Sequence, residues 1–465
     1  MVENQIKTIL CIGAGYVGTP TMAVIADNCP EYKIIVVDKN IDKIRAWNSD
    51  SLPIYEPGLE DIIKRRRNKN LFFSEDIATS IKEASIIFVS VNTPTKKFGL
   101  GAGMASDLQF IELVARDIIK YAQEDKLVIE KSTLPVKTAE ALSRVLHSND
   151  KGLKFEVLSN PEFLAEGTAI NDLQHPDRVL IGSMKTESGI ESAKILRNIY
   201  THWVPTEKIK LTNLWSSELS KLVANAMLAQ RVSSINSISA LCEKTNADVE
   251  EVSHAVGMDS RIGSKFLNTS VGFGGSCFKK DILNLVYICR YYGLNEVADY
   301  WEQVVIINEY QQNRFVNKVI DKMFNTVVDK KIAVLGFAFK ANTGDTRESP
   351  AITVTKMLLK ERADVAIYDP KAIENAKLDL ADYSQSNNLH FYNNAEDAIK
   401  DSHAILVLTA WDEFKELDFE EAYRTMKKPS FIFDGCNILQ HEQLKNLGFN
   451  VNCIGKNLDR LKDDE

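Results

Sequence analysis

A cysteine between glycines and lysines is the feature of this sequence that most directly suggests chemistry. Cys277 lies in the segment VGFGGSCFKKD, just before a predicted helix over residues 281–293. Lysines and a helix N-terminus both stabilise the thiolate, which is the nucleophilic form of cysteine. We therefore predict that Cys277 is a nucleophile. Cys11 and Cys289 lie within apolar runs and are predicted to be buried structural thiols.

Two acids form a second candidate group. Glu162 and Glu166 are four residues apart in SNPEFLAEG, directly after an apolar run at residues 157–158. We predict that Asn160 caps a helix whose first residue is Pro161, so that both carboxylates share one helix face. Such a pair suits proton transfer or ligand binding. The alternative is that the two acids only complement the positive end of that helix.

A lysine and an amide form a third pair, Lys221 and Asn225, again four residues apart. An ammonium beside an amide can stabilise an oxyanion. The alternative is a solvated lysine on an exposed helix face, and the spacing fits both. The pair lies away from the apolar stripe of a predicted amphipathic helix, which comprises Leu219, Leu222, Val223, Ala226 and Met227.

A glycine turn near the N-terminus predicts a dinucleotide site. The first glycine of GAGYVG, Gly13, would turn the chain, Gly15 would admit a pyrophosphate, and Gly18 would let the helix pack closely on the strand. Asp38 ends the next strand, where a carboxylate accepts from both ribose hydroxyls and repels a 2′-phosphate. We therefore predict NAD as the cofactor. Residues 91–95 (VNTPT) and 132–133 follow later strands, at the edge where such sheets hold ligands.

A dinucleotide site and a reactive thiol together predict the oxidation of an alcohol to an acid. One hydride transfer gives an aldehyde, which lacks a carbinol from which a second hydride could leave. Addition of the thiol restores that carbinol as a thiohemiacetal, and a second hydride transfer then leaves a thioester. Water releases the acid.

The hydrophobic pattern predicts an α/β fold: two Rossmann-like doubly wound domains joined by a long central helical segment. Apolar runs at residues 9–12, 34–37, 86–91, 127–129, 157–158 and 179–181 alternate with helical patterns. From residue 331, the segments KIAVLGFAFK, VAIYDPK and AILVLTAW repeat the order of the opening segments, without the later glycines of the turn. We predict domains at residues 1–212, 213–327 and 328–465.

Composition excludes several classes of protein. A formal net charge of -8 argues against a general nucleic-acid-binding protein. Seven scattered cysteines without a CxxC pair predict neither a disulfide framework nor a metal site. The N-terminus lacks the features of a signal peptide, and no apolar run is long enough to span a membrane. We predict a cytoplasmic protein with no metal, no nucleic acid and no membrane partner.

In combination, these motifs resemble the UDP-glucose/GDP-mannose dehydrogenase family, most closely its eukaryotic UDP-glucose 6-dehydrogenase branch. The resemblance runs from about residue 8 to about residue 455 and includes GAGYVG, VNTPT, EKST, SNPEFLAEGTAI, ELSKLVANAMLAQRVSSINS, VGFGGSCFKKD, GFAFKANTGDTRESPA and FIFDG. It implies an NAD-dependent, four-electron oxidation of UDP-glucose to UDP-glucuronate. It also implies that the C-terminal domain binds the UDP-sugar, and that the central helices form a homodimer that assembles further, up to a hexamer.

The resemblance implies a role for each site residue. The nucleophile would be Cys277, and the other catalytic residues would be Lys221, Glu162, Asn225, Asp281 and Thr133. The cofactor would contact Gly13, Ala14, Gly15, Tyr16, Val17, Gly18, Asp38, Lys43, Val91, Asn92, Thr93, Pro94, Thr95, Ser132, Thr133, Glu166, Cys277, Lys280 and Arg347. The substrate would contact Glu162, Phe163, Leu164, Ala165, Glu166, Lys221, Asn225, Asn268, Phe273, Gly274, Phe339 and Lys340, with Arg261 supplied by a neighbouring subunit.

Three positions depart from the family's pattern. Cys436 follows FIFDG, where the family has a substrate-binding arginine, so one charge-assisted contact is missing. Such a contact is worth about 1.5–3 kcal/mol, or roughly tenfold or more in affinity. Lys43 stands where animal enzymes have arginine, and Asn268 stands where a lysine is usual. None of the three belongs to the proposed chemistry.

Three alternatives remain at this point. The same chemistry could act on GDP-mannose or a UDP-N-acetylhexosamine, because those dehydrogenases share the thiol and the double fold. A two-electron dehydrogenase of the 6-phosphogluconate or hydroxyacyl type would need no thiol, so Cys277 argues against it. A catalytically silent nucleotide-sugar binder would not need the set Cys277, Lys221, Glu162 and Asp281.

Overall fold

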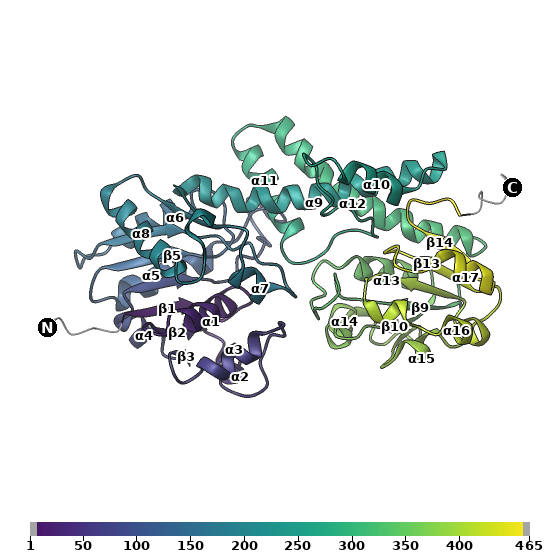
Figure 1. Cartoon of the computed structure of the whole chain (residues 1–465), viewed down its shortest axis with the longest axis horizontal. Coiled ribbons are helices and arrows are strands. Elements are labelled where there is room, and N and C mark those ends of the chain that lie inside the picture. Colours follow the sequence, from purple (N-terminus) through teal and green to yellow (C-terminus); the bar gives the residue numbers. More distant parts are fainter. Residues whose placement is uncertain (1–6, 459–465) are drawn as a thin grey trace. The chain divides into compact units, whose positions relative to one another are not determined.

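The computed structural model describes residues 7–458 of the chain (Figure 1). The chain forms two compact units that divide between Ala224 and Asn225. The division falls within one continuous helix, α9 (Leu214–Thr245), which contributes residues to both units. None of the helices in residues 7–458 is both long and apolar enough to cross a membrane.

The first unit is built on an eight-stranded sheet within the described residues, with the order β3-β2-β1-β4-β5-β6-β7-β8. All neighbouring strands are parallel except β6 and β7, which pair antiparallel at Ser159 and Gly182. The strands are β1 (Thr8–Ile12), β2 (Lys33–Val37), β3 (Leu71–Ser74), β4 (Ile86–Val89), β5 (Lys126–Glu130), β6 (Phe155–Ser159), β7 (Val179–Ser183) and β8 (Ile209–Asn213).

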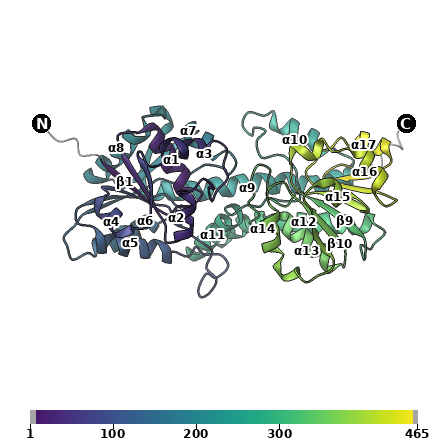
Figure 2. The same cartoon turned by 90° about the horizontal axis from the view of Figure 1, so that it is seen from below.

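Helices cover both faces of this sheet (Figure 2). One face packs against α1 (Gly18–Asn28), α3 (Leu59–Arg66), α7 (Ala169–Gln174) and α8 (Glu187–Tyr200). The other packs against α4 (Ile77–Glu83), α5 (Gln109–Tyr121) and α6 (Thr138–His147). The short helix α2 (Ile41–Trp47) follows β2. Because the central strands are buried on both faces, their sequences are continuously apolar rather than alternating.

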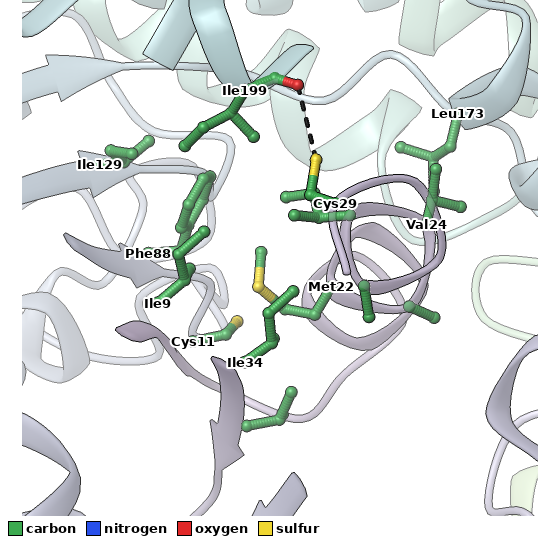
Figure 3. Packing of buried hydrophobic residues seen from close by; sticks show 14 of the residues in the cluster. Ile9, Cys11, Met22, Val24, Cys29, Ile34, Phe88, Ile129, Leu173 and Ile199 are labelled. Atoms are coloured by element: carbon green, nitrogen blue, oxygen red, sulfur yellow. Dashed lines mark hydrogen bonds between the residues drawn. The ribbon is translucent and has the colours of Figure 1, made fainter. Parts of the chain in front are cut away.

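Figure 3 shows part of the core on the α1 side of the sheet, where side chains of α1 meet those of the strands. Ile9, Cys11 and Phe88 come from β1 and β4, and Met22 comes from α1; all four are fully buried. At the end of α1, the Cys29 thiol donates to the carbonyl oxygen of Ile199 (3.7 Å). Cys11 and Cys289 are buried, as predicted, at 0% and 6% exposure.

The second unit joins long helices to a six-stranded parallel sheet in the described part of the chain, with the order β11-β10-β9-β12-β13-β14. Besides the end of α9, the helices before the sheet are α10 (Val249–Gly257), α11 (Phe278–Tyr291) and α12 (Asn295–Lys322). The strands are β9 (Lys331–Leu335), β10 (Asp364–Tyr368), β11 (Leu389–Phe391), β12 (Ala404–Val407), β13 (Phe431–Asp434) and β14 (Asn450–Cys453). The remaining helices are α13 (Pro350–Lys360), α14 (Ile373–Asp379), α15 (Ala395–Ile399), α16 (Phe419–Thr425) and α17 (His441–Leu447).

The two sheets confirm the predicted α/β fold with a repeated Rossmann-like arrangement. Counted from its first strand, each sheet has the strand order 3-2-1-4-5-6, and the first sheet adds two strands beyond it. In such sheets the strand order reverses between the first and fourth strands, which are parallel neighbours, and ligands bind at the carboxyl ends of the strands there. Strands β3 and β8 of the first sheet and β11, β13 and β14 of the second were not predicted. Of these, β3 is partly exposed, and β8 is both partly exposed and mostly polar.

The aspartate after the second strand distinguishes the two sheets. Asp369, which follows β10, is 2% exposed. Its carboxylate accepts hydrogen bonds from five N–H donors, which are the backbone N–H groups of Phe337, Ala338, Lys371 and Ala372 and the indole of Trp411. The Asp369 carboxylate is therefore fully bonded within the protein, and the second sheet cannot bind a ligand hydroxyl through it.

Candidate functional site

The turn between β1 and α1 has the geometry that a dinucleotide requires. Gly13 has φ +114°, and a Cβ there would lie 2.2 Å from the carbonyl oxygen of Ser90. A Cβ at Gly18 would lie 2.3 Å from the carbonyl oxygen of Gly13, so only glycine allows the helix to pack this closely. A Cβ at Gly15 would meet nothing closer than the Lys43 ammonium at 4.0 Å. The backbone at Gly15 is thus open to a pyrophosphate, with a cation beside it.

Asp38 lies at the carboxyl end of β2, next to this turn. Its Oδ2 accepts from the backbone N–H of Ala14 (2.9 Å), and its Oδ1 accepts from that of Asn40 (2.9 Å). Lys43 pairs with the same carboxylate at 3.3 Å. The first turn of α1 carries no acidic side chain that would compete for an anion. Together these residues fit NAD, which would place its ribose on Asp38 and its pyrophosphate on the glycine turn.

The loops after β4 and β5 are tied together at the same edge of the sheet. The Ser132 hydroxyl donates to the carbonyl oxygen of Val91 (2.7 Å), and the Thr93 hydroxyl donates to that of Thr133 (3.0 Å). Since β1 lies between β2 and β4, and β5 lies beyond β4, the first unit brings the glycine turn, residues 91–95 and residues 132–133 to one edge.

The segment around Glu162 differs from the predicted helix. Residues 160–168 form no helix, and α7 begins only at Ala169. Asn160 does not cap a helix, because its side chain donates to the carbonyl oxygen of Leu180 (2.8 Å). The Glu162 carboxylate itself accepts from the backbone N–H groups of Phe163 (2.8 Å) and Leu164 (3.2 Å). The prediction of two acids on one helix face was therefore wrong.

Glu162 is paired with a lysine that the sequence analysis did not identify. The Lys131 ammonium lies 2.7 Å from Glu162 Oε2, and the lysine side chain is 2% exposed. It also lies 3.0 Å from Asn160 Oδ1 and 3.2 Å from the Tyr200 hydroxyl. The Tyr200 hydroxyl donates to Asn160 Oδ1 (2.7 Å). Lys131 belongs to the segment EKST and directly precedes Ser132. The segment alone does not predict that the lysine side chain is buried beside Glu162.

Burial and charge act in opposite directions on this pair. Burial alone would raise the pKa of Glu162, but the Lys131 ammonium and the Phe163 N–H outweigh it, so its pKa lies below the usual value. Burial alone would lower the pKa of Lys131, but Glu162 and Tyr200 outweigh it, so its pKa lies above the usual value. Glu162 is thus held as a carboxylate.

Helix α9 buries polar groups beside part of the predicted apolar stripe. Within that stripe Leu222 and Ala226 are fully buried, whereas Leu219 and Met227 are 37% and 55% exposed. Lys221 and Asn225, predicted to lie away from the buried side, are 8% and 4% exposed. The Lys221 ammonium lies 5.3 Å from the centre of the Phe163 ring, beside the Glu162 segment. The buried side of this helix therefore combines the polar residues Lys221 and Asn225 with the apolar residues Leu222 and Ala226.

In the second unit, Cys277 is an exposed thiol directly before the first residue of α11. Its backbone carbonyl accepts from the N–H of Asp281 (2.8 Å), which starts the helical hydrogen bonding, and no side chain caps this end. The Ser276 hydroxyl lies 3.5 Å from the Cys277 sulfur. The position agrees with the prediction of an accessible thiol at a helix N-terminus.

A buried polar pair lies one turn into α11. Asn225 Nδ2 donates to Asp281 Oδ2 (2.6 Å), and Asp281 is 1% exposed. The Lys280 ammonium lies 3.6 Å from the other carboxylate oxygen of Asp281. The second unit therefore brings together three predicted catalytic residues, Asn225, Cys277 and Asp281.

The glycines before Cys277 are needed for close packing against residues 339–348. A Cβ at Gly274 would lie 2.6 Å from the carbonyl oxygen of Glu348, and a Cβ at Gly275, where φ is +86°, would lie 3.0 Å from the Phe339 ring. The N–H of Gly275 donates to the carbonyl oxygen of Arg347 (2.8 Å). The fold thus places the predicted substrate residues Phe273, Gly274 and Phe339 and the cofactor residue Arg347 around the thiol loop.

Other predicted residues have less distinctive surroundings. Arg261, with a side chain 87% exposed, pairs with Asp259 (2.6 Å), and Asn268 is exposed. Lys340 lies 5.5 Å from the centre of the Phe339 ring. Burial, then the nearby Asp434, raise the pKa of the Cys436 thiol and keep it neutral, and a thiol cannot supply the positive charge of an arginine at any pH. Asn437 cannot replace it either, because its side chain is bonded on both sides to the backbone of Ile454.

Comparison with known proteins gives consistent matches along the chain. Three models of the UDP-glucose/GDP-mannose dehydrogenase family match: the NAD binding domain at residues 7–204, the central domain at 215–310 and the UDP binding domain at 333–441. The chain is 58% identical to UDP-glucose 6-dehydrogenase 4 of Arabidopsis thaliana over 98% of both proteins, and 57% identical to UDP-glucose 6-dehydrogenase 1 of Glycine max over the same share.

A solved structure supports the fold over the whole chain. The UDP-glucose dehydrogenase of Pyrobaculum islandicum is 27% identical, with a TM-score of 0.84 over 97% of this chain and 98% of that one. The UDP-D-ManNAc dehydrogenase of Pyrococcus horikoshii has a TM-score of 0.80 at 24% identity, over 97% and 99% of the two chains, and supports the fold alone. From the NAD-binding turn to the UDP-binding domain, the chain belongs to the UDP-glucose/GDP-mannose dehydrogenase family.

Proposed function

We propose that this protein is an NAD-dependent UDP-glucose 6-dehydrogenase that oxidises UDP-glucose to UDP-glucuronate, with Cys277 as the nucleophile. The observation that carries this proposal is the exposed thiol at the start of α11, beside the buried pair of Asn225 and Asp281. It occurs in a chain 58% identical to plant UDP-glucose 6-dehydrogenases over 98% of their length.

In this proposal, the chemistry at the thiol has two halves. Bound at the glycine turn and Asp38, NAD would supply the hydride acceptor, one molecule of NAD for each of the two oxidations. In the first half, the sugar's C6 alcohol becomes an aldehyde. In the second, the Cys277 sulfur bonds to that carbon as a thiohemiacetal, and loss of the second hydride leaves a thioester. Attack by water forms a C–O bond, breaks the C–S bond and returns the thiol.

The other site residues would stabilise developing charge, orient the reacting groups and transfer protons. Lys221 supplies an ammonium for the oxyanions that develop at C6. Asn225 and Asp281 orient the reacting oxygen or the attacking water, and Thr133 assists them. Glu162, which is kept ionised, takes a proton from the attacking water. Glu166 faces the cofactor, and residues 333–441 form the UDP binding domain of the family.

Self-association is part of the proposal, and the central helices support it. Met227, Ile238 and Leu241 of α9 are 55%, 40% and 58% exposed. Ile238 and Leu241 follow Met227 by 11 and 14 residues, so the three side chains lie within about 60° of one another around the helix. An exposed apolar stripe of this kind suits a dimer interface. We propose that the protein forms a homodimer through the central helices and that dimers assemble further.

The identity of the sugar is tested by supplying UDP-glucose, GDP-mannose and UDP-N-acetylglucosamine separately with NAD and identifying the products by mass spectrometry. We expect UDP-glucuronate from UDP-glucose and little turnover of the other two. Preference for another sugar would reassign the substrate. It would also indicate that Cys436, in place of the family's arginine, changes which nucleotide sugar binds. Tight binding without turnover of all three would favour a silent nucleotide-sugar binder.

A further inference from the structure

We propose that Lys131 is a positioning residue for thioester hydrolysis: its ammonium fixes the Glu162 carboxylate in one orientation and in its ionised form. This inference rests on the proposed function, in which Glu162 accepts a proton from water. It concerns residues of the first unit alone. The supporting contact is the 2.7 Å ion pair between two side chains that are 2% and 15% exposed.

The ammonium of Lys131 is itself held in place by two further acceptors. Asn160 and Tyr200, which are 1% and 3% exposed, supply oxygens at 3.0 Å and 3.2 Å. Asn160 is fixed through the Leu180 carbonyl, and Tyr200 comes from α8. With Glu162 Oε2, the three ammonium protons have three oxygen acceptors. A lysine this fully bonded serves as a rigid support rather than as a proton carrier.

The other groups that face Glu162 do not substitute for Lys131. Lys221 of α9 also lowers the pKa of Glu162, but by less than Lys131 and the Phe163 N–H do. Tyr200, whose pKa is raised first by burial, stays neutral. Without the Lys131 charge, burial would dominate and raise the pKa of Glu162. A protonated Glu162 could not accept a proton from water.

Replacing Lys131 by methionine, a neutral side chain of similar length, should change how the steady-state rate depends on pH. In Lys131→Met, the acidic limb of the steady-state rate should move to higher pH by about one unit or more, which corresponds to roughly tenfold loss of rate on that limb. Because hydrolysis becomes slow, a rapid burst of up to two NADH per active site should precede steady turnover. The acyl-enzyme should then be detectable by intact-protein mass spectrometry. An unshifted limb without a burst overturns the proposal.

A double-mutant cycle separates positioning from a general structural role. If Lys131 acts through Glu162, then adding Lys131→Met to a Glu162→Gln enzyme should change its residual rate less than about twofold. An equal loss in both backgrounds overturns the proposal. If Lys131→Met alone does not fold, recovery of folded, NAD-binding protein in the double variant supports the coupling, and failure of both variants contradicts it.

The wild-type enzyme distinguishes this inference from the proposed function. If the wild type forms no UDP-glucuronate, the function itself fails. If it does and Lys131→Met keeps the wild-type pH profile, only the role of Lys131 fails. Lys126→Met is the matched control, because Lys126 is a buried lysine on β5 that pairs with Glu124 at 3.0 Å, outside the Glu162 network. We expect it to leave the pH profile unchanged.

Discussion

The cysteines of this chain occupy contrasting environments, and the contrast supports the proposal that Cys277 is the reactive one. Burial raises the pKa of Cys11, Cys29 and Cys453 to about 12, so these thiols remain neutral and unreactive near neutral pH. Cys277 is exposed and stands at the start of a helix. The sequence was sufficient to predict burial of Cys11 and Cys289 and an accessible position for Cys277, but it led to no prediction for Cys29 or Cys453. It did not reveal which segment the glycines before Cys277 pack against.

Replacing the nucleophile tests the residue-scale account. Cys277→Ser should lower kcat by about three orders of magnitude or more, because the weaker nucleophile cannot form the thioester. NAD and UDP-glucose binding, measured by calorimetry, should stay close to wild type. Cys289→Ser, which changes a 6% exposed thiol on the same helix, is the control and should stay active. Full activity of Cys277→Ser would exclude the nucleophile assignment.

Glu162 shows where prediction from sequence ended at this scale. Its position after a strand and its neighbours indicated a functional acid. The helix assigned to residues from Pro161 did not form, since Asn160 is bonded to Leu180 and Lys131 rather than to the following backbone. Partners from β7 and from the loop after β5 are far away in sequence, so local capping rules could not account for them.

At the scale of elements, α9 carries the main surprise. Its buried face includes Glu218, whose carboxylate accepts from the N–H groups of Lys137 (2.9 Å) and Ala139 (2.8 Å) at the start of α6. Glu130, at the end of β5, is 2% exposed and interacts with Glu218. The hydrophobic periodicity did not predict the burial of these acids. Hydrophobicity scales take no account of the partners that a polar side chain finds in the folded protein.

This carboxyl pair predicts a pH-dependent stability. Burial, then the charge of Glu218, raise the pKa of Glu130, and burial likewise raises that of Glu218. An acid with a raised pKa binds its proton more tightly in the folded state, so the contribution of this pair to stability is greatest at low pH and falls as pH rises above about 4.5, the unfolded value. Glu130→Gln removes one charge and can donate to Glu218.

We therefore expect Glu130→Gln to raise the melting temperature at pH 8 by several degrees and to have little effect at pH 5. About 1 kcal/mol corresponds to roughly 2–4 °C in a domain of this size. Glu112→Gln, on the exposed surface of α5, is the control and should behave alike at both pH values. An equal effect of Glu130→Gln at both pH values would contradict the assignment of a raised pKa.

At the scale of the whole molecule, the repeat of one strand order explains how much the sequence could predict. Echoes between the opening segments and those after residue 331 indicated two related sheets, and both have the order 3-2-1-4-5-6. The repeated segments did not show how the two sheets differ. Asp38 accepts few hydrogen bonds from the backbone, whereas the equivalent Asp369 accepts hydrogen bonds from five N–H donors. Burial of a side chain depends on packing that a short motif does not encode.

Assembly is a prediction at the same scale. Leu241→Asp, in the exposed stripe of α9, should weaken self-association because it places a charge in the proposed interface. Light scattering after size-exclusion chromatography would measure the mass in solution. Leu378→Asp, at a 74% exposed leucine of α14, is the matched control. A Leu241→Asp protein with the same mass as the wild type would place the interface elsewhere.

The most direct test of the central claim is the number of NADH molecules formed for each UDP-glucose consumed, with NAD in excess and no added metal. A thiol-dependent double oxidation predicts a ratio of about two. A ratio near one, with an aldehyde as the product, would contradict the account and reduce Cys277 to a residue without a role in turnover.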